Sequence, residues 1–169
     1  EAIGRTAAPP LVLALSGDLG TGKTTLARAI ARGAGVRGAI PSPTYNLLFR
    51  YPADRGIEVV HLDLYRLDQA DDVWALGWAD LPEAHELVVI EWPERAREYL
   101  PPSRWDVTLK MGRDEDHRLV ALVRTGDPGA IPYPQPDERL LDSRAAGPVK
   151  GESAARQTGT ARAGADGGE

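Results

Sequence analysis

The stretch Gly17-Asp18-Leu19-Gly20-Thr21-Gly22-Lys23-Thr24 fills every fixed position of the phosphate-loop pattern G-x-x-x-x-G-K-[ST]. The glycines let the backbone curl so that successive N–H groups point at phosphate oxygens, and a helix that follows adds its positive dipole end. Lys23 then reaches the terminal phosphates, and the Thr24 hydroxyl is a ligand for Mg²⁺. The stretch therefore predicts a site for the phosphates of a nucleotide.

The flanks of this loop have the context that the pattern requires. Residues 11–15 form an apolar run of strand length, and residues 25–32 repeat apolar side chains at helical spacing. A glycine-rich turn between a strand and a helix is the simpler alternative. Only phosphate contact, however, accounts for Lys and Thr directly after the last glycine.

Composition limits the possible functions. The chain has 169 residues, 42% of them hydrophobic, which favours one domain with a real core. Its net charge of −5 argues against a protein that holds nucleic acid by itself, so any such role would run through a partner. No run of 18 apolar residues could span a membrane. The absence of cysteine excludes disulfides and fits a reducing compartment, and we expect a cytoplasmic protein.

The rest of the chain predicts an α/β domain. Strand-like runs occur at residues 11–15, 46–51, 58–62, 87–90, 105–111 and 117–123. Helical patterns occur at residues 25–32, 68–76 and 93–100, with a short helical turn near residues 82–85. The expected fold is a P-loop NTPase-like three-layer sandwich, with a mixed, mostly parallel sheet, antiparallel hairpin additions and flanking helices. We place this domain at residues 1–125, and we interpret residues 126–169, rich in Gly, Pro, Ala, Ser and Thr, as a disordered C-terminal tail.

Two acids end apolar strands in the way that a Walker B acid does. Asp63 follows residues 58–62, and Glu91 closes the continuously apolar residues 87–90. Ligands bind at the carboxyl ends of strands in open α/β sheets, and a carboxylate must hold Mg²⁺ opposite Thr24, directly or through water. Spacing alone does not rank the two acids, and either could be a solvated acid at a strand end.

Thr44 and Trp92 are further candidate site residues, and each has two possible interpretations. Thr44 lies in the loop before the second strand, where switch-type nucleotide hydrolases place a hydroxyl that senses the third phosphate, or it simply opens a strand. Trp92 offers an aromatic face at the edge of the site, or it is a core residue. The histidines lack metal-ligand spacing, and we expect all three to be structural or exposed: His61, His85 and His117.

Four segments, in this order, resemble the bacterial TsaE (YjeE) family, the ATPase of tRNA threonylcarbamoyladenosine synthesis: SGDLGTGKTTLAR, SPTYNLLFRY, HLDLYRLDQADDVWALGW and VVIEWPERA. The resemblance covers roughly residues 11–109. It implies a P-loop domain that uses ATP and Mg²⁺ and hydrolyses ATP weakly alone. It also implies that the domain, expected to be monomeric by itself, works on the TsaB–TsaD heterodimer. That complex transfers the threonylcarbamoyl group to the adenosine beside the anticodon, so tRNA is contacted only through partners.

The resemblance also implies residue roles. Those in catalysis are Lys23, Thr44, Asp63 and Glu91. Those in nucleotide binding are Gly17 through Thr24, with Thr25 and Trp92. Those that hold Mg²⁺ are Thr24, Glu91 and Asp63. Family members carry a helix-forming segment with a Thr before the first strand, and this chain has only ten residues before Leu11.

Two other classes of protein share the phosphate loop. A small P-loop kinase would need an acceptor pocket and an Arg-bearing lid, and the sequence shows no convincing lid. A guanine-nucleotide switch would need an N-K-x-D segment to read the base, and the chain contains none.

Overall fold

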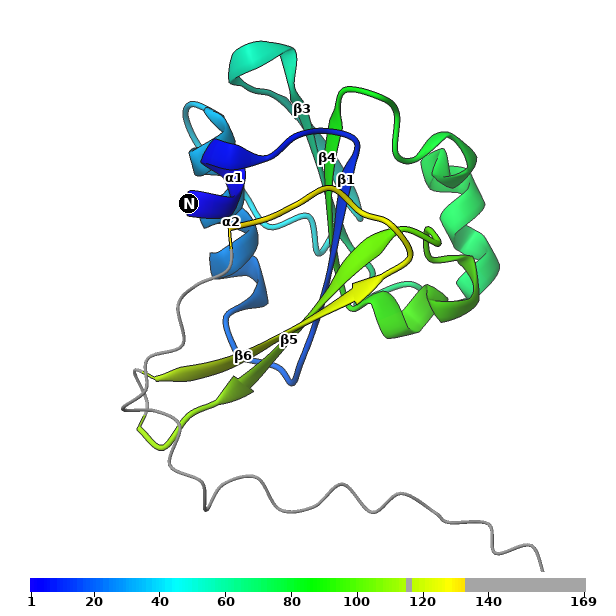
Figure 1. Ribbon diagram of the computed structural model, residues 1–169. Coiled ribbons are helices and arrows are strands. Elements are labelled where there is room, and N and C mark those ends of the chain that lie inside the picture. Colours follow the sequence, from blue (N-terminus) through cyan, green and yellow to red (C-terminus); the bar gives the residue numbers. More distant parts are fainter. Residues whose placement is uncertain (115–116, 133–169) are drawn as a thin grey trace, which may run out of the picture. The chain divides into compact units, whose positions relative to one another are not determined.

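The computed structural model describes residues 1–114 and 117–132 of the chain (Figure 1). In this part, the strands are β1 (Leu11–Ser16), β2 (Leu48–Pro52), β3 (Glu58–Asp63), β4 (Glu86–Glu91), β5 (Arg104–Met111) and β6 (Arg118–Thr125). The α-helices are α1 (Ala2–Thr6) and α2 (Lys23–Ala34). Four 3₁₀ segments are η1 (Asp54–Gly56), η2 (Ala70–Leu76), η3 (Trp78–Asp80) and η4 (Pro93–Tyr99). None of these helices is both long enough and apolar enough to cross a membrane.

All six strands form one sheet in the order β2-β3-β4-β1-β5-β6. The four central strands, β3, β4, β1 and β5, run parallel. The outer strands β2 and β6 pair antiparallel with β3 and β5. This topology confirms the predicted mixed, mostly parallel sheet with a hairpin added at each edge.

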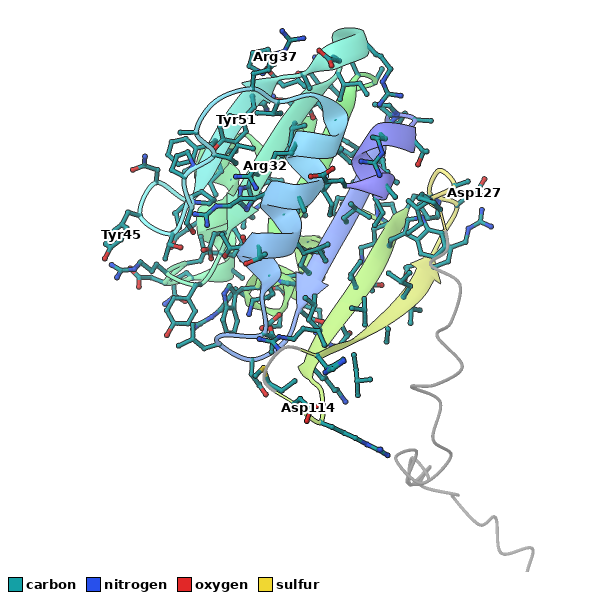
Figure 2. The ribbon with its side chains drawn as sticks, turned by 90° about the vertical axis from the view of Figure 1, so that its left-hand side faces the viewer. Arg32, Arg37, Tyr45, Tyr51, Asp114 and Asp127 are labelled. Atoms are coloured by element: carbon teal, nitrogen blue, oxygen red, sulfur yellow. The ribbon has the colours of Figure 1, made fainter. Side chains whose placement is uncertain are left out.

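Helices cover both faces of the central strands, so the domain has three layers (Figure 1). One core cluster joins alternate residues of β1, such as Leu13, to Ile30 of α2. The other joins Val12 to Val73 of η2 and Trp78 of η3. Burial on both faces explains why β1 and β4 are continuously apolar rather than alternating. Figure 2 shows α2 lying across the face of the sheet that carries the cluster with Leu13 and Ile30.

Helix α1 occupies the short segment before β1 and packs against α2. An added Cβ on Gly4 would lie 1.9 Å from the Ile30 carbonyl oxygen, and one on Gly33 would lie 2.1 Å from that of Glu1. The two helices therefore cross closely where each lacks a side chain. The chain thus forms a helix ending at Thr6 in the ten residues before Leu11.

Two further details differ from the sequence-based expectations. The short helical turn lies at Trp78–Asp80, and residues 82–85 form a turn that leads into β4. Residues 126–132 continue the packed domain, since Trp105 Nε1 donates to the Gly129 carbonyl at 2.8 Å and Ile131 joins the α2-side core. The remainder of the expected tail, residues 133–169, lies outside the described residues, so the domain boundary stays a prediction.

Candidate functional site

The phosphate loop connects β1 to α2 and rests on the neighbouring hairpin. Gly17 has a φ of +135°, and an added Cβ there would lie 2.2 Å from the Leu109 carbonyl oxygen of β5. From β6, Arg118 Nε donates to the Thr21 carbonyl at 3.0 Å. Helix α2 begins at Lys23, directly after the loop. The predicted strand, loop and helix are therefore all present, and β5 and β6 support the loop from the side.

Lys23 is held by contacts that a phosphate could replace. Its Nζ donates to the carbonyl oxygens of Gly17 at 2.6 Å and Asp18 at 2.9 Å. It also lies 3.7 Å from the ring centroid of Trp92. Burial lowers the pKa of Lys23 from its usual 10.5, and nearby carboxylates, Glu91 foremost, oppose that shift. An anion at this position would compensate the buried charge better than two neutral carbonyls do.

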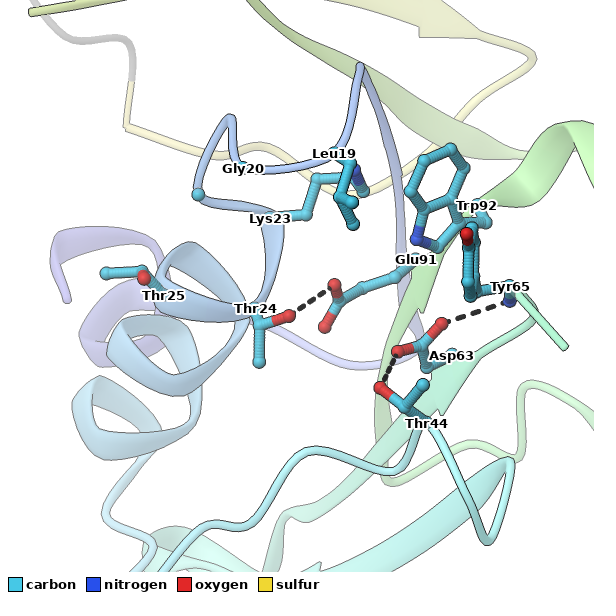
Figure 3. Close-up of a pocket in the computed structure, with 11 residues that line it drawn as sticks. Leu19, Gly20, Lys23, Thr24, Thr25, Thr44, Asp63, Tyr65, Glu91 and Trp92 are labelled. Atoms are coloured by element: carbon cyan, nitrogen blue, oxygen red, sulfur yellow. Dashed lines mark hydrogen bonds between the residues drawn. The ribbon is translucent and has the colours of Figure 1, made fainter. Parts of the chain in front are cut away.

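The two candidate acids lie side by side and bond to different threonines (Figure 3). Thr24 Oγ1 donates to Glu91 Oε2 at 2.7 Å. Thr44 Oγ1 donates to Asp63 Oδ2 at 2.5 Å, and the Tyr65 backbone N–H donates to Asp63 Oδ1 at 3.0 Å. The strand register sets this arrangement, because Asp63 and Glu91 are paired at the ends of the parallel strands β3 and β4.

These side chains surround a cavity of about 340 Å³. Its walls are formed by Leu19, Gly20, Gly22, Lys23, Thr24, Thr25, Thr44, Asp63, Tyr65, Glu91 and Trp92. All but Tyr65 were candidates from the sequence. The remaining candidates, Gly17, Asp18 and Thr21, do not line the cavity but make contacts within the loop. The Gly17 and Asp18 carbonyls bind Lys23, and Thr21 Oγ1 donates to the Asp18 carbonyl at 2.9 Å.

The donor set suits Mg²⁺ shared with phosphate. A hydroxyl from Thr24 and carboxylates from Glu91 and Asp63 are the oxygen ligands that Mg²⁺ prefers. Within residues 1–114 and 117–132, no three or more His, Cys, Asp or Glu side chains gather in a metal-binding arrangement. A donor set with few carboxylates is typical of Mg²⁺ sites that are completed by substrate phosphates and water.

Sequence reasoning missed three residues that shape the site. His61, expected to be structural or exposed, is buried, and its Nε2 lies 2.8 Å from Glu91 Oε1. Its two-residue spacing from Asp63 could have placed both on one face of the strand. The Tyr65 ring packs at a tilt of 47° against Trp92, with ring centroids 4.9 Å apart. Arg118 reaches the phosphate loop from a point 97 residues away in sequence, which no local pattern indicates.

A phosphate loop after the first strand of a mostly parallel sheet, with helices on both faces, defines a P-loop NTPase-like α/β protein. The comparisons with known proteins narrow this class. The family model for "Threonylcarbamoyl adenosine biosynthesis protein TsaE" matches residues 1–120, and the chain belongs to the TsaE family.

Individual relatives agree with this assignment. The chain is 34% identical over 113 residues to the tRNA threonylcarbamoyladenosine biosynthesis protein TsaE of Haemophilus influenzae, covering 67% of this chain and 70% of that protein. It is 37% identical over 124 residues to the protein of that name from Rickettsia bellii, covering 73% and 84%. Among solved structures, YdiB of Bacillus subtilis matches with a TM-score of 0.57 and 27% identity, covering 74% of this chain and 75% of that chain.

Proposed function

We propose that this chain binds Mg·ATP at the phosphate loop and hydrolyses ATP in tRNA N6-threonylcarbamoyladenosine biosynthesis. One observation carries the proposal: Thr24 Oγ1 donates to the buried Glu91 carboxylate at 2.7 Å. That pair combines the hydroxyl that binds Mg²⁺ in P-loop proteins with an acid at a strand end. The names of the matched family and of its relatives supply the process.

Each side chain has a role in this proposal. The loop backbone and Lys23 bind the phosphates, and Lys23 exchanges two carbonyls for phosphate oxygens. Thr24 and Glu91 hold Mg²⁺, which when bound neutralises charge on the phosphates. Asp63 adds a second carboxylate on the neighbouring strand. Through its hydrogen bond to Asp63, Thr44 connects the segment before β2 to the acids.

Trp92 and Thr25 complete the nucleotide site from two sides of the cavity. The Trp92 ring covers the Lys23 ammonium on one side and packs at a tilt against Tyr65, while the loop carbonyls of Gly17 and Asp18 bind the ammonium from the other side. Thr25 follows the loop in the first turn of α2. A rigid aromatic wall beside the lysine limits where the terminal phosphates can settle.

The proposed protein partner is the TsaB–TsaD heterodimer, with tRNA contacted only through it. The net charge of −5 supports this division, because a protein that grips tRNA directly needs clustered positive charge. The chain acts in the cytoplasm and is monomeric when alone. Hydrolysis changes the segment from Ser42 to Tyr51, which reaches the site through Thr44, and so resets the partner complex between turnovers.

Phosphate release from Mg·ATP, measured with the chain alone and with TsaB–TsaD added, tests the proposal. We expect slow release alone, a change on adding the partners, and no release by the Lys23→Ala variant. With tRNA and threonylcarbamoyl-adenylate present, modified nucleosides per TsaB–TsaD complex should stop at a single round without this chain and rise with it. Hydrolysis that depended on a small-molecule acceptor and ignored the partners would instead favour a P-loop kinase.

A further inference from the structure

A histidine and a threonine bind the two oxygens of the Glu91 carboxylate. Thr24 Oγ1 lies 2.7 Å from Oε2, and His61 Nε2 lies 2.8 Å from Oε1. His61 and Glu91 are each 1% exposed, so neither exchanges its partner for water. The three side chains come from α2, β3 and β4, three separate elements that meet at this carboxylate.

The direction of the histidine bond follows from chemistry. A carboxylate only accepts hydrogen bonds, so Nε2 of His61 is the donor and carries a proton. Without that donor, Glu91 Oε1 would be a buried acceptor with no bond, and nothing would compensate its loss of water. The carboxylate would also be free to turn about its last torsion and present either oxygen to Thr24.

The surroundings of His61 indicate that a polar side chain occupies this position in order to bond to Glu91. Along β3, residues 59, 61 and 63 share the face that packs toward α2, and Val59 belongs to the apolar core there. An apolar side chain at position 61 would extend that core at lower desolvation cost than an imidazole. The contact that offsets this cost is the bond to Glu91.

We infer that His61 is a positioning residue: its Nε2–H fixes one oxygen of Glu91 so that the other faces Thr24, with which it would hold a metal ion. This inference rests on the proposed ATPase function. Hydrogen-bonded partners of metal-binding side chains typically change metal affinity or activity about 10- to 100-fold when removed. His61 is therefore required for the use of Mg²⁺ and is not required for binding the nucleotide itself.

The test compares His61→Gln with His61→Met. These side chains have nearly the same length and shape, but only Gln offers an N–H near the position of Nε2. We expect His61→Met to lower kcat for phosphate release about 10- to 100-fold and to raise the Mg²⁺ concentration for half-maximal rate. His61→Gln should restore most of both. Nucleotide affinity without Mg²⁺, followed by the tryptophan emission of the chain, to which Trp92 in the cavity wall contributes, should be the same in both variants because Lys23 and the loop are intact.

Val59→Ala is the matched control, since Val59 is fully buried on the same face of β3 and does not belong to the cavity wall. It should lower the melting temperature while kcat and the Mg²⁺ requirement stay at their normal values. Equal kcat values in the Gln and Met variants would overturn the inference. A parallel loss of nucleotide binding and melting temperature in His61→Met would overturn it too, because a purely structural histidine behaves that way.

One further measurement requires neither catalysis nor a folded variant of His61. The ¹⁵N spectrum of the imidazole side chains, recorded on the unmodified protein, should show His61 protonated at Nε2, with that signal shifted by Glu91→Gln. A His61 protonated only at Nδ1 would overturn the inference even if ATP turnover is found. Absence of Mg²⁺-dependent ATP turnover in the unmodified protein would instead refute the proposed function, whatever the spectrum shows.

Discussion

Replacing Glu91 by Gln separates the chemistry of the site from the stability of the fold. The amide keeps the shape of the side chain but loses the negative charge and one of two acceptor oxygens. Glu91 now accepts from both Thr24 Oγ1 and His61 Nε2, so one of these bonds must be lost or reversed. We expect Glu91→Gln to impair ATP turnover and to leave the fold intact.

The magnitude follows from these bonds. A hydrogen bond to a charged group contributes about 1.5–3 kcal/mol. At about 1.4 kcal/mol for each factor of ten, losing one such bond in the transition state lowers kcat roughly 10- to 150-fold. The free energy of unfolding of Glu91→Gln should increase or stay unchanged. The carboxylate is 1% exposed, and removing its charge relieves a desolvation cost that the free protein otherwise bears.

Glu86 offers a matched control at the opposite end of the same strand, β4. It is also fully buried, but it pairs with Arg50, and its Oε2 accepts from the Glu83 backbone N–H at 2.7 Å. Glu86→Gln should lower the free energy of unfolding by about 1–3 kcal/mol, because it removes the charge of a buried carboxylate that pairs with the partly exposed Arg50. Its kcat should be unchanged, since Glu86 does not line the cavity.

Two measurements on each variant decide whether Glu91 serves catalysis or the fold. They are phosphate release with saturating Mg·ATP, and unfolding in denaturant without nucleotide. The two buried glutamates should give opposite patterns, with Glu91→Gln losing activity and Glu86→Gln losing stability. Near-normal kcat in Glu91→Gln would refute the assignment and transfer the metal-binding role to Asp63. Loss of stability with unchanged kcat would show that Glu91 serves only the fold.

Three more variants probe the loop and its supports. Gly17→Ala should lower the free energy of unfolding by about 2 kcal/mol, because its Cβ would meet the Leu109 carbonyl at a positive φ; denaturant unfolding measures this, and an unchanged midpoint would contradict the loop geometry. Arg118→Met removes the donor to the Thr21 carbonyl and should raise KM for ATP roughly fivefold with little change in kcat, as about 1 kcal/mol is lost. Lys23→Met should abolish ATP turnover and yet stabilise the nucleotide-free protein. Burial lowers the pKa of Lys23, so its charged form costs stability at neutral pH, and the cost disappears as the pH rises through the folded-state pKa toward 10.5. The stability gap between Lys23→Met and the unmodified protein should therefore narrow in alkaline buffer, and a constant gap would contradict this origin.

Much of the fold follows from local patterns in the sequence. The phosphate loop, its strand and its helix are predictable because glycine positions and apolar periodicity are both local signals. Asp63 and Glu91 are predictable as neighbours because acids that close parallel strands collect at one edge of the sheet. Their separate partners are not, since the Thr24 bond to Glu91 and the Thr44 bond to Asp63 depend on how α2 and the following loop pack on the strands.

Other features depend on contacts between distant segments. Helix α1 has five residues, too few for a periodic signal, and it is held by close backbone contacts at Gly4 and Gly33. Arg118 belongs to an edge strand whose sequence alone gives no reason for contact with the loop. Residues 126–132 resemble a linker in composition, but Ile131 finds a place in the core beside Trp105. In each case, the conformation of the segment depends on a contact with residues that are distant in sequence.

The site is the continuation of the core along one face of the sheet. On β3, the α2-facing side chains change from Val59 to His61 to Asp63, and on β4 the same face ends on Glu91. The apolar part of this face anchors α2, and the polar part lies beside the first turn of that helix, where the dipole favours negative charge. A slip of one residue in strand register would turn Asp63 or Glu91 to the opposite face, toward η2 and η4. The same pairing that buries the core therefore also places both acids, and a variant that weakens the β3–β4 pairing should lose Mg²⁺-dependent turnover before it loses the fold.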